Sequence, residues 1–329
     1  MPAIETIDLQ REYPARRGAG LRAVDGIDLA VEPGEVYGFL GPNGAGKTTT
    51  VRMLVTLLRP TGGRATVAGF DVATEPAEVR KRIGVALQAA ALDLLMTGRE
   101  MLELAATLHG IAPESVVDRG GDLLERVGLS AAADRRVGTY SGGMQRRLDL
   151  AMALIHEPEV LFLDEPTTGL DPTSRLTLWD EVRRLRDEGT TVFLTTQYLE
   201  EADQLADRVG IIASGKIVAE GTPASLKAEV GAPHLDVTLV DESHRDAARE
   251  VLARFGDGRP PTSDCDLSVA LPDGSAGLAP IVRALDDAGV QVATLDVKEP
   301  SLDDVFLNKT GEHLEGADAA PEPEPEPAA

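Results

Sequence analysis

The stretch "GPNGAGKT" (Gly41–Thr48) matches the pattern G-x-x-x-x-G-K-[ST], whose residue types can hold the phosphate groups of a nucleotide. It follows an apolar run, Val36–Leu40, that predicts a buried strand, and it leads into Thr48–Leu58, which has helical periodicity. The glycines let backbone N–H groups turn toward phosphate oxygens, and the helix N-terminus adds a partial positive charge. A glycine-rich turn with a chance lysine is the alternative, but the strand–loop–helix context favours phosphate binding.

Two side chains of this loop carry distinct chemistry. Lys47 can place its ammonium group beside the β- and γ-phosphates, and the hydroxyl of Thr48 can bind Mg²⁺. The loop backbone supplies the remaining contacts. The predicted nucleotide-binding positions are Gly41, Pro42, Asn43, Gly44, Ala45, Gly46, Lys47, Thr48 and Thr49.

Two carboxylates end the strand-like run "VLFLDEP" (Val160–Pro166). Asp164 would hold the Mg²⁺ ion, directly or through water. Glu165, one residue further along, is placed to polarise an attacking water as a general base. Alone, such a pair is more often a solvated strand end. Together with the loop Gly41–Thr48, it predicts a catalytic site.

The segment "YSGGMQRRLDLAMAL" (Tyr140–Leu154) begins a predicted helix with a polar residue and two glycines. Ser141 can cap the helix, while Gly142 and Gly143 admit the close approach of an anion. The helix dipole favours a phosphate at this end. An ordinary capped helix is the alternative, and this segment alone does not decide between the two.

A third segment, "TVFLTTQYLEEAD" (Thr191–Asp203), changes from a strand-like run to an acidic helix. The residues Thr195–Gln197 stand at the change. In open α/β sheets the carboxyl end of a parallel strand is where ligands bind. Gln197 is therefore a candidate for contact with a ligand.

The order of these segments predicts an α/β domain over about residues 1–230, because strand-like and helical runs alternate around a helical block at about residues 90–157. Two strands, Ala3–Leu9 and Ala23–Val31, open the chain. The run "VGIIASGKIVAEGTP" reads as a hairpin that closes at Gly215–Lys216.

After "GAP" the pattern restarts and predicts a small α+β module over residues 231–311. Its predicted elements are the strand "LDVTLV", the helix His244–Arg254, the strand "LSVAL", the helix Leu278–Ala288 and the strand "VQVATLDV". Near its end "SLDDVFL" (Ser301–Leu307) is either a strip that docks a partner or an amphipathic helix whose Leu302, Val305 and Phe306 enter the module's core. The Pro- and Glu-rich residues 312–329 cannot bury apolar surface and are expected to be disordered.

Composition argues against several classes of protein. The net charge of −23 disfavours a nucleic-acid binder, which needs a basic surface. The single Cys265 cannot form an intramolecular disulfide, and no Cys/His cluster has metal-ligand spacing. No apolar run approaches the roughly 20 residues that span a bilayer, and the N-terminus lacks a signal-peptide pattern. A cytoplasmic chain is expected, with any membrane role supplied by a partner.

The order of motifs resembles that of the ATP-binding cassette (ABC) ATPases. It comprises the phosphate-binding loop, Gln88 in "VALQAA", Ser-Gly-Gly, "FLDEP", "GLD" (Gly169–Asp171) and a polar strand end. The resemblance covers about Ala3 to Leu226. It implies a P-loop NTPase cassette with a mixed-sheet core, an antiparallel β subdomain and an inserted helical subdomain. It also implies a head-to-tail homodimer, in which ATP lies between one P-loop and the other copy's Ser141, Gly142 and Gly143.

The resemblance implies roles for three more residues. Tyr13 matches the aromatic residue that stacks on adenine, although a core tyrosine is an alternative. Gln88 matches the loop glutamine that contacts Mg²⁺ or water and senses the transmembrane partner, although an exposed loop amide is an alternative. Asp171 matches the aspartate that communicates across the dimer.

At Gln197 the sequence departs from the family, which usually carries a histidine that bonds to the γ-phosphate and the attacking water. Glutamine keeps a hydrogen-bond donor and an acceptor but cannot take up a proton. We therefore expect Gln197 to hydrogen-bond to the γ-phosphate while Glu165 acts as the base. We expect nucleotide binding to be retained, and the departure argues against a histidine-assisted mechanism.

Further motifs resemble the daunorubicin/doxorubicin-resistance type of exporter ATPase. They are "YSGGM" in place of "LSGGQ", "FLDEPTTGLDP", "TTQYLEEAD" and "SLDDVFL". That subgroup also has a small C-terminal domain. The resemblance implies a separate ABC-2-type membrane permease as partner, a location at the cytoplasmic face of the cell membrane, and hydrophobic drugs or natural products as cargo. Leu87–Glu100 and the helices after it are expected to form the permease-docking groove, or else only the core of the helical block.

Other functions fit the sequence less well. A soluble ATP-driven clamp on ribosomes or DNA normally has two cassettes or a coiled-coil insertion, whereas this acidic chain has one P-loop and no heptads. A binding-only module conflicts with the intact set of Lys47, Asp164 and Glu165. An ABC importer subunit is not favoured by Gln197 or "SLDDVFL". The sequence thus predicts the ATPase subunit of an export transporter.

Overall fold

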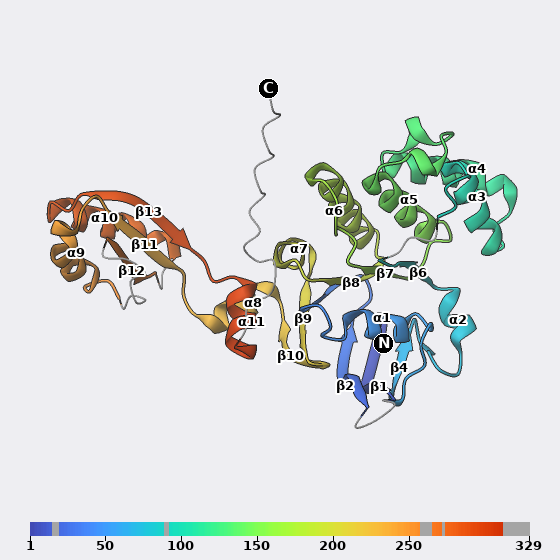
Figure 1. Ribbon diagram of the computed structural model, residues 1–329, viewed down its shortest axis with the longest axis horizontal. Coiled ribbons are helices and arrows are strands. Elements are labelled where there is room, and N and C mark those ends of the chain that lie inside the picture. Colours follow the sequence, from blue (N-terminus) through green and yellow to red (C-terminus); the bar gives the residue numbers. More distant parts are fainter. Residues whose placement is uncertain (15–19, 89–91, 257–264, 272–273, 312–329) are drawn as a thin grey trace. The chain divides into compact units, whose positions relative to one another are not determined.

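The computed structural model describes residues 1–14, 20–88, 92–256, 265–271 and 274–311. Within it the chain divides into a larger unit built on Met1–Pro223 and a smaller unit built on Ala224–Asn308 (Figure 1). The predicted disordered tail, residues 312–329, lies outside the described residues, as does part of the predicted docking segment Leu87–Glu100.

A six-stranded mixed sheet forms the centre of the larger unit, in the order β10-β9-β3-β8-β7-β6. Its strands are β3 (Val36–Leu40), β6 (Ile83–Ala86), β7 (Val160–Asp164), β8 (Thr191–Thr196), β9 (Arg208–Ala213) and β10 (Lys216–Gly221). Five of them pair in parallel, and β10 is antiparallel to β9. The predicted β9–β10 hairpin is confirmed, but Lys216 is the first residue of β10 and so lies outside the turn.

Alternation along the parallel strands builds two hydrophobic cores, one on each face of the sheet. In β7, Leu161 and Leu163 pack on the helical side, while Phe162 packs on the side of the antiparallel sheet. In β8, Phe193 lies on the same side as Phe162, with ring centroids 5.6 Å apart. Both faces are covered, which explains why these strands read as continuous apolar runs.

A four-stranded antiparallel sheet, in the order β2-β1-β4-β5, forms a second layer of this unit. Its strands are β1 (Ile4–Tyr13), β2 (Leu21–Val31), β4 (Gly62–Val67) and β5 (Phe70–Asp71), followed by the short helix α2 (Pro76–Arg80). Strands β1 and β2 both exceed the predicted lengths, because their pairing continues past register shifts to Tyr13 and Leu21. The predicted mixed sheet with an antiparallel subdomain is confirmed.

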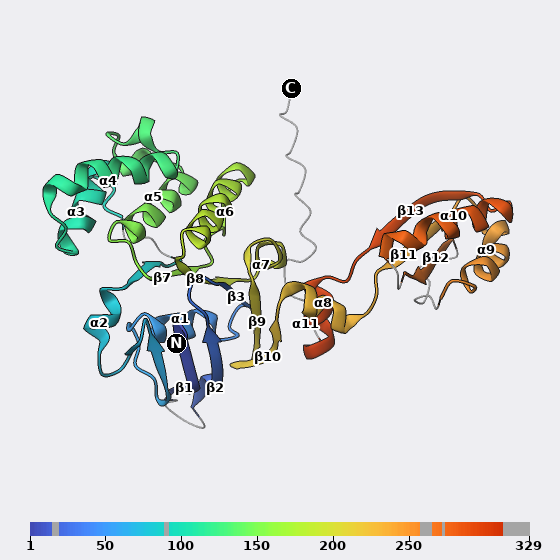
Figure 2. The same cartoon turned by 180° about the vertical axis from the view of Figure 1, so that it is seen from behind.

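The helices of the larger unit are α1 (Lys47–Leu54), α3 (Gly98–Leu108), α4 (Pro113–Arg126), α5 (Gly142–Leu154), α6 (Pro172–Asp187) and α7 (Leu199–Leu205), with 3-10 turns at Ser130–Ala132 and Val137–Thr139. Helices α3, α4 and α5 gather into one group in both ribbon views (Figures 1 and 2). Helix α1 ends at Leu54, short of the predicted Leu58, and Thr56 just beyond it has a left-handed φ of 66°.

The smaller unit is a three-stranded antiparallel sheet, in the order β12-β11-β13, with helices packed on one face. Its elements are α8 (Pro223–Val230), β11 (His234–Leu239), a 3-10 turn (Glu242–His244), α9 (Arg245–Leu252), β12 (Asp266–Ala270), a second 3-10 turn (Gly274–Gly277), α10 (Leu278–Asp287), β13 (Val292–Lys298) and α11 (Leu302–Thr310). The alternating strands and helices predicted for this region are confirmed.

The motif "SLDDVFL" forms the start of α11. Leu302, Val305 and Phe306 are buried, as the amphipathic-helix reading predicts. They lie outside the cluster formed by the sheet with α9 and α10, so the prediction that they join the module's core is wrong. Helix α11 lies beside α8 in both ribbon views (Figures 1 and 2).

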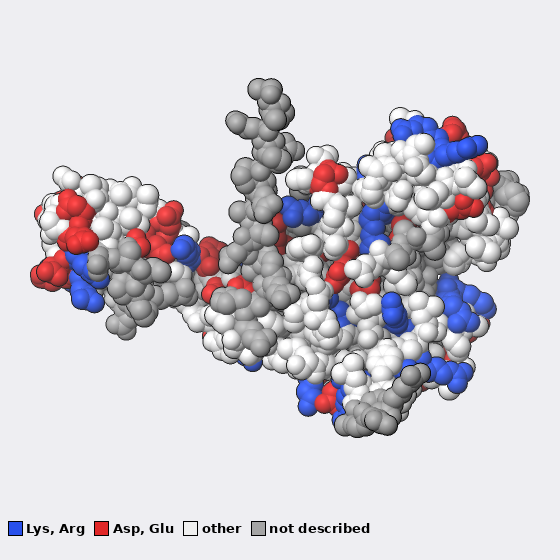
Figure 3. Space-filling view, in the orientation of Figure 1, with Lys and Arg blue, Asp and Glu red and all other residues white. Residues whose placement is uncertain are grey.

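Charged side chains are interspersed over the face shown in Figure 3, where basic and acidic groups alternate across the larger unit. Many are paired at the surface, such as Arg99 with Asp134 at 2.8 Å and Arg184 with Glu188 at 2.9 Å. Within the described ranges, no helix is long and apolar enough to cross a membrane.

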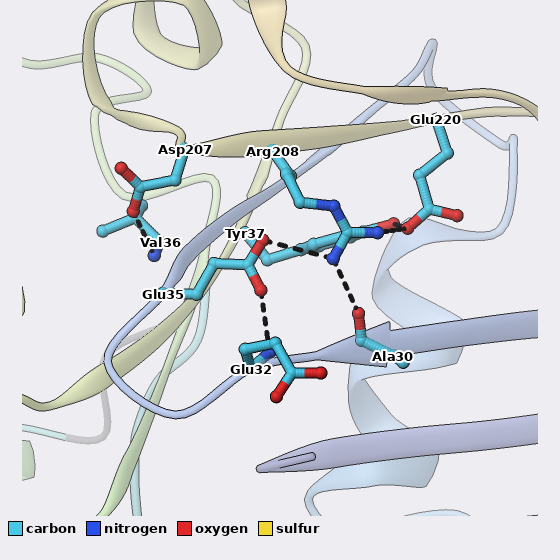
Figure 4. Close-up of polar contacts among 8 residues, drawn as sticks. All are labelled: Ala30, Glu32, Glu35, Val36, Tyr37, Asp207, Arg208 and Glu220. Atoms are coloured by element: carbon cyan, nitrogen blue, oxygen red, sulfur yellow. Dashed lines mark hydrogen bonds and ion pairs between the residues drawn. The ribbon is translucent and has the colours of Figure 1, made fainter.

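Arg208 at the start of β9 ties the two sheets of the larger unit together (Figure 4). Its guanidinium donates to the carbonyl oxygen of Ala30 in β2 at 3.0 Å and pairs with Glu35 at 3.3 Å. It also pairs with Glu220 of β10, which accepts a hydrogen bond from the Tyr37 hydroxyl at 3.1 Å. This network fixes β3, the strand that leads into the predicted phosphate-binding loop, against its neighbours.

Candidate active site

The loop between β3 and α1 has room only for glycine at two positions. A Cβ on Gly41 would lie 2.3 Å from the carbonyl oxygen of Ile212, and one on Gly46 would lie 2.5 Å from that of Ala23. Gly46 also has a φ of 114°, which L side chains rarely adopt. The loop therefore turns tightly into α1, whose first residue is Lys47.

Lys47 lies buried within the curve of this loop, with 4% of its surface exposed. Its Nζ donates to the carbonyl oxygens of Gly41 at 2.7 Å and Pro42 at 3.1 Å, and it lies 3.3 Å from Glu165 Oε1. Burial lowers the pKa of Lys47, and the Glu165 carboxylate opposes that shift. A cation held in this way can bind phosphate oxygens that enter the loop.

Asp164 ends β7 beside the loop and is almost fully buried. Its Oδ1 accepts hydrogen bonds from Thr48 Oγ1 at 3.4 Å and from Thr195 Oγ1. Its Oδ2 is buried and has no hydrogen-bond partner among the described residues. An unpaired buried carboxylate oxygen beside a threonine hydroxyl has the donor chemistry that Mg²⁺ requires, so these residues fit the ion.

Glu165 turns away from the strand with a φ of 47°, an uncommon conformation for a residue other than glycine. Its N–H donates to the carbonyl oxygen of Thr195 at 3.0 Å, which holds the turn against β8. This conformation directs the carboxylate toward Lys47. Strain of this kind persists where surrounding contacts fix the backbone, and it recurs at active sites.

Lys47, Thr48 and Glu165 border one open cavity of ≈ 160 Å³, and Asp164 lies next to it through its contact with Thr48. It is lined by Ala23, Pro42, Asn43, Gly44, Gly46, Lys47, Thr48, Thr49, Gln88 and Glu165. The structure thus brings together most of the predicted loop positions with the predicted base and the loop glutamine. Among the described residues, the lining does not include Tyr13, Gln197 or the segment Ser141–Gly143.

The segment Ser141–Gly143 lies elsewhere, at the start of α5. Ser141 caps the helix and accepts a hydrogen bond from the Met144 N–H at 3.2 Å. A Cβ on Gly142 would meet open space, whereas one on Gly143 would lie 2.5 Å from Ser174 Oγ. The partial positive charge of a helix N-terminus is suited to bind an anion.

Asp171 caps the next helix, α6. It accepts hydrogen bonds from the N–H of Ser174 at 2.9 Å and from its hydroxyl at 2.7 Å. These hydrogen bonds lower the pKa of Asp171. Since Ser174 is also close to Gly143, the caps of α5 and α6 are neighbours.

Comparison with known proteins places this geometry in a family. Residues 24–168 match the model of the family described as ABC transporter. The chain is 49% identical to daunorubicin resistance ATP-binding protein DrrA2 of Streptomyces coeruleorubidus over 94% of this chain and 97% of that protein. It is 44% identical to doxorubicin resistance ATP-binding protein DrrA of Mycobacterium tuberculosis, over 89% and 90% of the two chains.

The chain is a member of the ABC transporter ATP-binding family. Its fold agrees, because an ATP-binding subunit of an ABC transporter matches 69% of this chain and 92% of its own with a TM-score of 0.63 at 26% identity. A dimeric ATP-binding cassette bound to ADP and Pi matches in fold, with a TM-score of 0.62 over 67% of this chain. The predicted resemblance, the cassette fold and the assignment as an ATPase are confirmed.

Two residues linked to nucleotide by this resemblance are not among the described residues that line the cavity. Tyr13 is half-buried at the end of β1, and the Arg11 guanidinium lies 4.8 Å from its ring centroid. It is outside both core clusters of the larger unit, unlike a core tyrosine. Gln197 is half-buried directly after β8, two residues beyond Thr195.

Three buried residues around the site were not among the predicted site residues. Thr195 hydrogen-bonds Asp164, Glu201 is a buried carboxylate that accepts from Trp179 at 3.3 Å, and Arg146 is buried against the backbone of β7. Burial raises the pKa of Glu201, and it raises the pKa of Asp149 beside Arg146 to about 6. In the sequence, Arg146 stands next to Arg147 within "QRR", and nothing there marks one arginine as buried.

Replacing Gln197 with histidine is expected to keep ATP turnover within about threefold of the wild type, because both side chains donate and accept hydrogen bonds at similar reach. Steady-state phosphate release by the purified proteins measures the effect, with Gln10→His on the antiparallel sheet as control. Complete loss of hydrolysis in Gln197→His alone would show that the pocket is built around glutamine.

Proposed function

We propose that this chain is the ATP-hydrolysing subunit of an ABC exporter. In this proposal the cassette is residues 1–230, with a helical subdomain at about residues 90–157, and residues 231–311 are an accessory domain. The observation that carries the proposal is the convergence of Lys47, Glu165 and Gln88 on one cavity, next to Asp164. Relatives that are similar over nearly their whole length are named drug-resistance ATP-binding proteins.

In this mechanism the P-loop N–H groups and Lys47 bind the β- and γ-phosphates. Mg²⁺, held by Thr48 and Asp164 with Gln88 nearby, would neutralise phosphate charge. Glu165 accepts a proton from the attacking water, and its carboxylate 3.3 Å from Lys47 is already at the phosphate end of the loop. Gln197 would donate a hydrogen bond to the γ-phosphate. Tyr13 would stack on the adenine ring.

The proposal includes a head-to-tail homodimer with ATP between the two copies. The support is that Ser141–Gly143 has the features of an anion site but does not line its own chain's nucleotide cavity. In the dimer it would cover the γ-phosphate bound by the other copy's P-loop. Asp171, close to Gly143, would then lie at the dimer interface.

The partner in this proposal is a separate membrane permease, and the chain works at the cytoplasmic face of the membrane. An apolar cavity of ≈ 500 Å³ between α3, α5 and β6 is the site at which we propose that a segment of the permease docks. Its rim includes Leu57, Leu104 and Leu108, which are 63%, 42% and 79% exposed. Exposed apolar patches of this kind mark interaction sites. The cargo is a hydrophobic drug or natural product.

The test is to purify tagged Glu165→Gln protein with Mg·ATP from detergent-solubilised native membranes and to identify what accompanies it. A stoichiometric multi-span membrane protein is the expected result, and a Leu104→Asp, Leu108→Asp double variant should lose it. If ribosomal or other soluble proteins come instead, the chain is a soluble ATP-driven clamp, the alternative function considered above.

A further inference from the structure

Arg146, in the second turn of α5, is buried against the catalytic end of β7. Its Nη2 donates to the carbonyl oxygen of Asp164 at 2.9 Å, and its Nε donates to that of Pro166 at 3.1 Å. These two carbonyl groups flank Glu165 on either side. One guanidinium therefore donates hydrogen bonds to the backbone both before and after the catalytic base.

The same side chain reaches the second loop of the site. Arg146 Nη1 donates to the carbonyl oxygen of Leu87, which directly precedes Gln88. It also lies 3.3 Å from Asp149 Oδ2, one helical turn further along α5. Asp149 is the only carboxylate that a described contact pairs with this guanidinium, and it fixes the orientation of the planar group.

The backbone conformation of Glu165 depends on these contacts. Its left-handed φ of 47° is unfavourable for a residue with a side chain and must be held by its surroundings. Thr195 holds the N–H of Glu165, and Arg146 holds the carbonyl groups of the residues before and after it, Asp164 and Pro166. Without these contacts the backbone would relax, and the carboxylate would leave its place beside Lys47.

We infer that Arg146 is a positioning residue for ATP hydrolysis, which sets Glu165 and Gln88 through backbone hydrogen bonds without touching the nucleotide. Since Arg146 is part of α5, it connects Glu165 rigidly to Ser141–Gly143 at the start of that helix. In the proposed dimer those residues face the ATP of the other site, so Arg146 links the two sites. This inference rests on the proposed hydrolysis at Glu165.

The experiment compares the wild type with Arg146→Ala, Arg146→Lys and Arg147→Ala. Arg147 is the matched control, because its Nη1 donates to the carbonyl oxygen of Val127 at 2.7 Å, away from the site. For each protein we would measure kcat for phosphate release, Kd for Mg·ADP by calorimetry, and the thermal unfolding midpoint. Each kcat is repeated with millimolar guanidinium chloride, which can enter the space left by the arginine side chain.

Arg146→Ala is expected to lower kcat by about a hundredfold, the loss that a displacement of about 1 Å can cause. The Kd for Mg·ADP should stay near the wild-type value, and guanidinium should restore part of the kcat in this variant only. Arg146→Lys keeps a buried cation with fewer donors, so its kcat should fall less. If Arg146→Ala does not fold, the same comparison of kcat with Kd in Arg146→Lys decides whether Arg146 is a positioning residue.

Two results would overturn the inference. One is an unchanged kcat in folded Arg146→Ala, or in folded Arg146→Lys where the alanine variant does not fold. The other is a parallel loss of kcat and Mg·ADP binding without rescue by guanidinium, which would make Arg146 a general structural residue. If the wild type itself releases no phosphate from Mg·ATP, the proposed function fails. If the wild type and the Arg146 variants hydrolyse ATP equally well, only the inference about Arg146 fails and the proposed function stands.

Discussion

Glu165→Gln is expected to lower ATP turnover by about 10²–10⁴-fold, the usual contribution of a general base, while ATP binding is retained. The substitution keeps the shape of the side chain and removes only its capacity to accept a proton. It also removes a negative charge 3.3 Å from Lys47, where we propose that the phosphates bind, so ATP should bind at least as tightly as in the wild type. With Mg·ATP the variant should accumulate as a dimer, because hydrolysis no longer opens it.

The measurements for this prediction are phosphate release, ATP affinity and mass by light scattering with and without Mg·ATP. Glu159→Gln is the matched control, since Glu159 is an exposed glutamate that precedes β7 at its other end. The control should behave as the wild type. Turnover by Glu165→Gln at the wild-type rate would mean that another group is the base.

Gly142→Asp is expected to abolish turnover without loss of stability or of ATP binding by its own P-loop. A side chain at Gly142 meets open space, and a carboxylate in the first turn of α5 is favourable to the helix dipole. In the proposed dimer, however, that carboxylate would face the γ-phosphate bound by the other copy. Repulsion there would prevent closure around ATP.

Gly121→Asp in α4 is the control for this prediction, because a side chain there also meets open space and the segment has no proposed nucleotide contact. Unfolding midpoints, ATP affinity and phosphate release are compared for the two variants. Gly142→Asp protein that hydrolyses ATP like the control would show that α5 does not contact the nucleotide.

Much of the fold was predictable because its signals are local. The strand before Gly41–Thr48, the strand ending at Asp164 and the hairpin near Gly215 each carry an apolar run bounded by turn residues. The tight turn of the loop Gly41–Thr48 was likewise predictable, since glycine is required at positions 41 and 46, where a Cβ would lie 2.3 and 2.5 Å from backbone oxygens. Such backbone constraints require glycine, and the required glycines can be recognised in the sequence.

What was missed depends on contacts between segments that are far apart in the chain. Arg146 donates to carbonyl oxygens at positions 87, 164 and 166, and no feature of "QRR" distinguishes it from Arg147. The left-handed turn at Glu165 likewise arises from pairing with β8. The burial of Leu302 and Phe306 was predicted, but the packing of their helix outside the module's core was not.

The proposed hydrolysis of ATP between two copies of this chain is tested most directly by mixing the two variants described above. Gly142→Asp copies keep Glu165, and Glu165→Gln copies keep Gly142, so a mixed dimer contains one site with both intact. Mixed in equal amounts before Mg·ATP is added, two inactive proteins should regain phosphate release, up to about a quarter of the wild-type rate, since about half of the dimers are mixed and each has one of its two sites intact. A mixture no more active than its separate components would contradict the shared site.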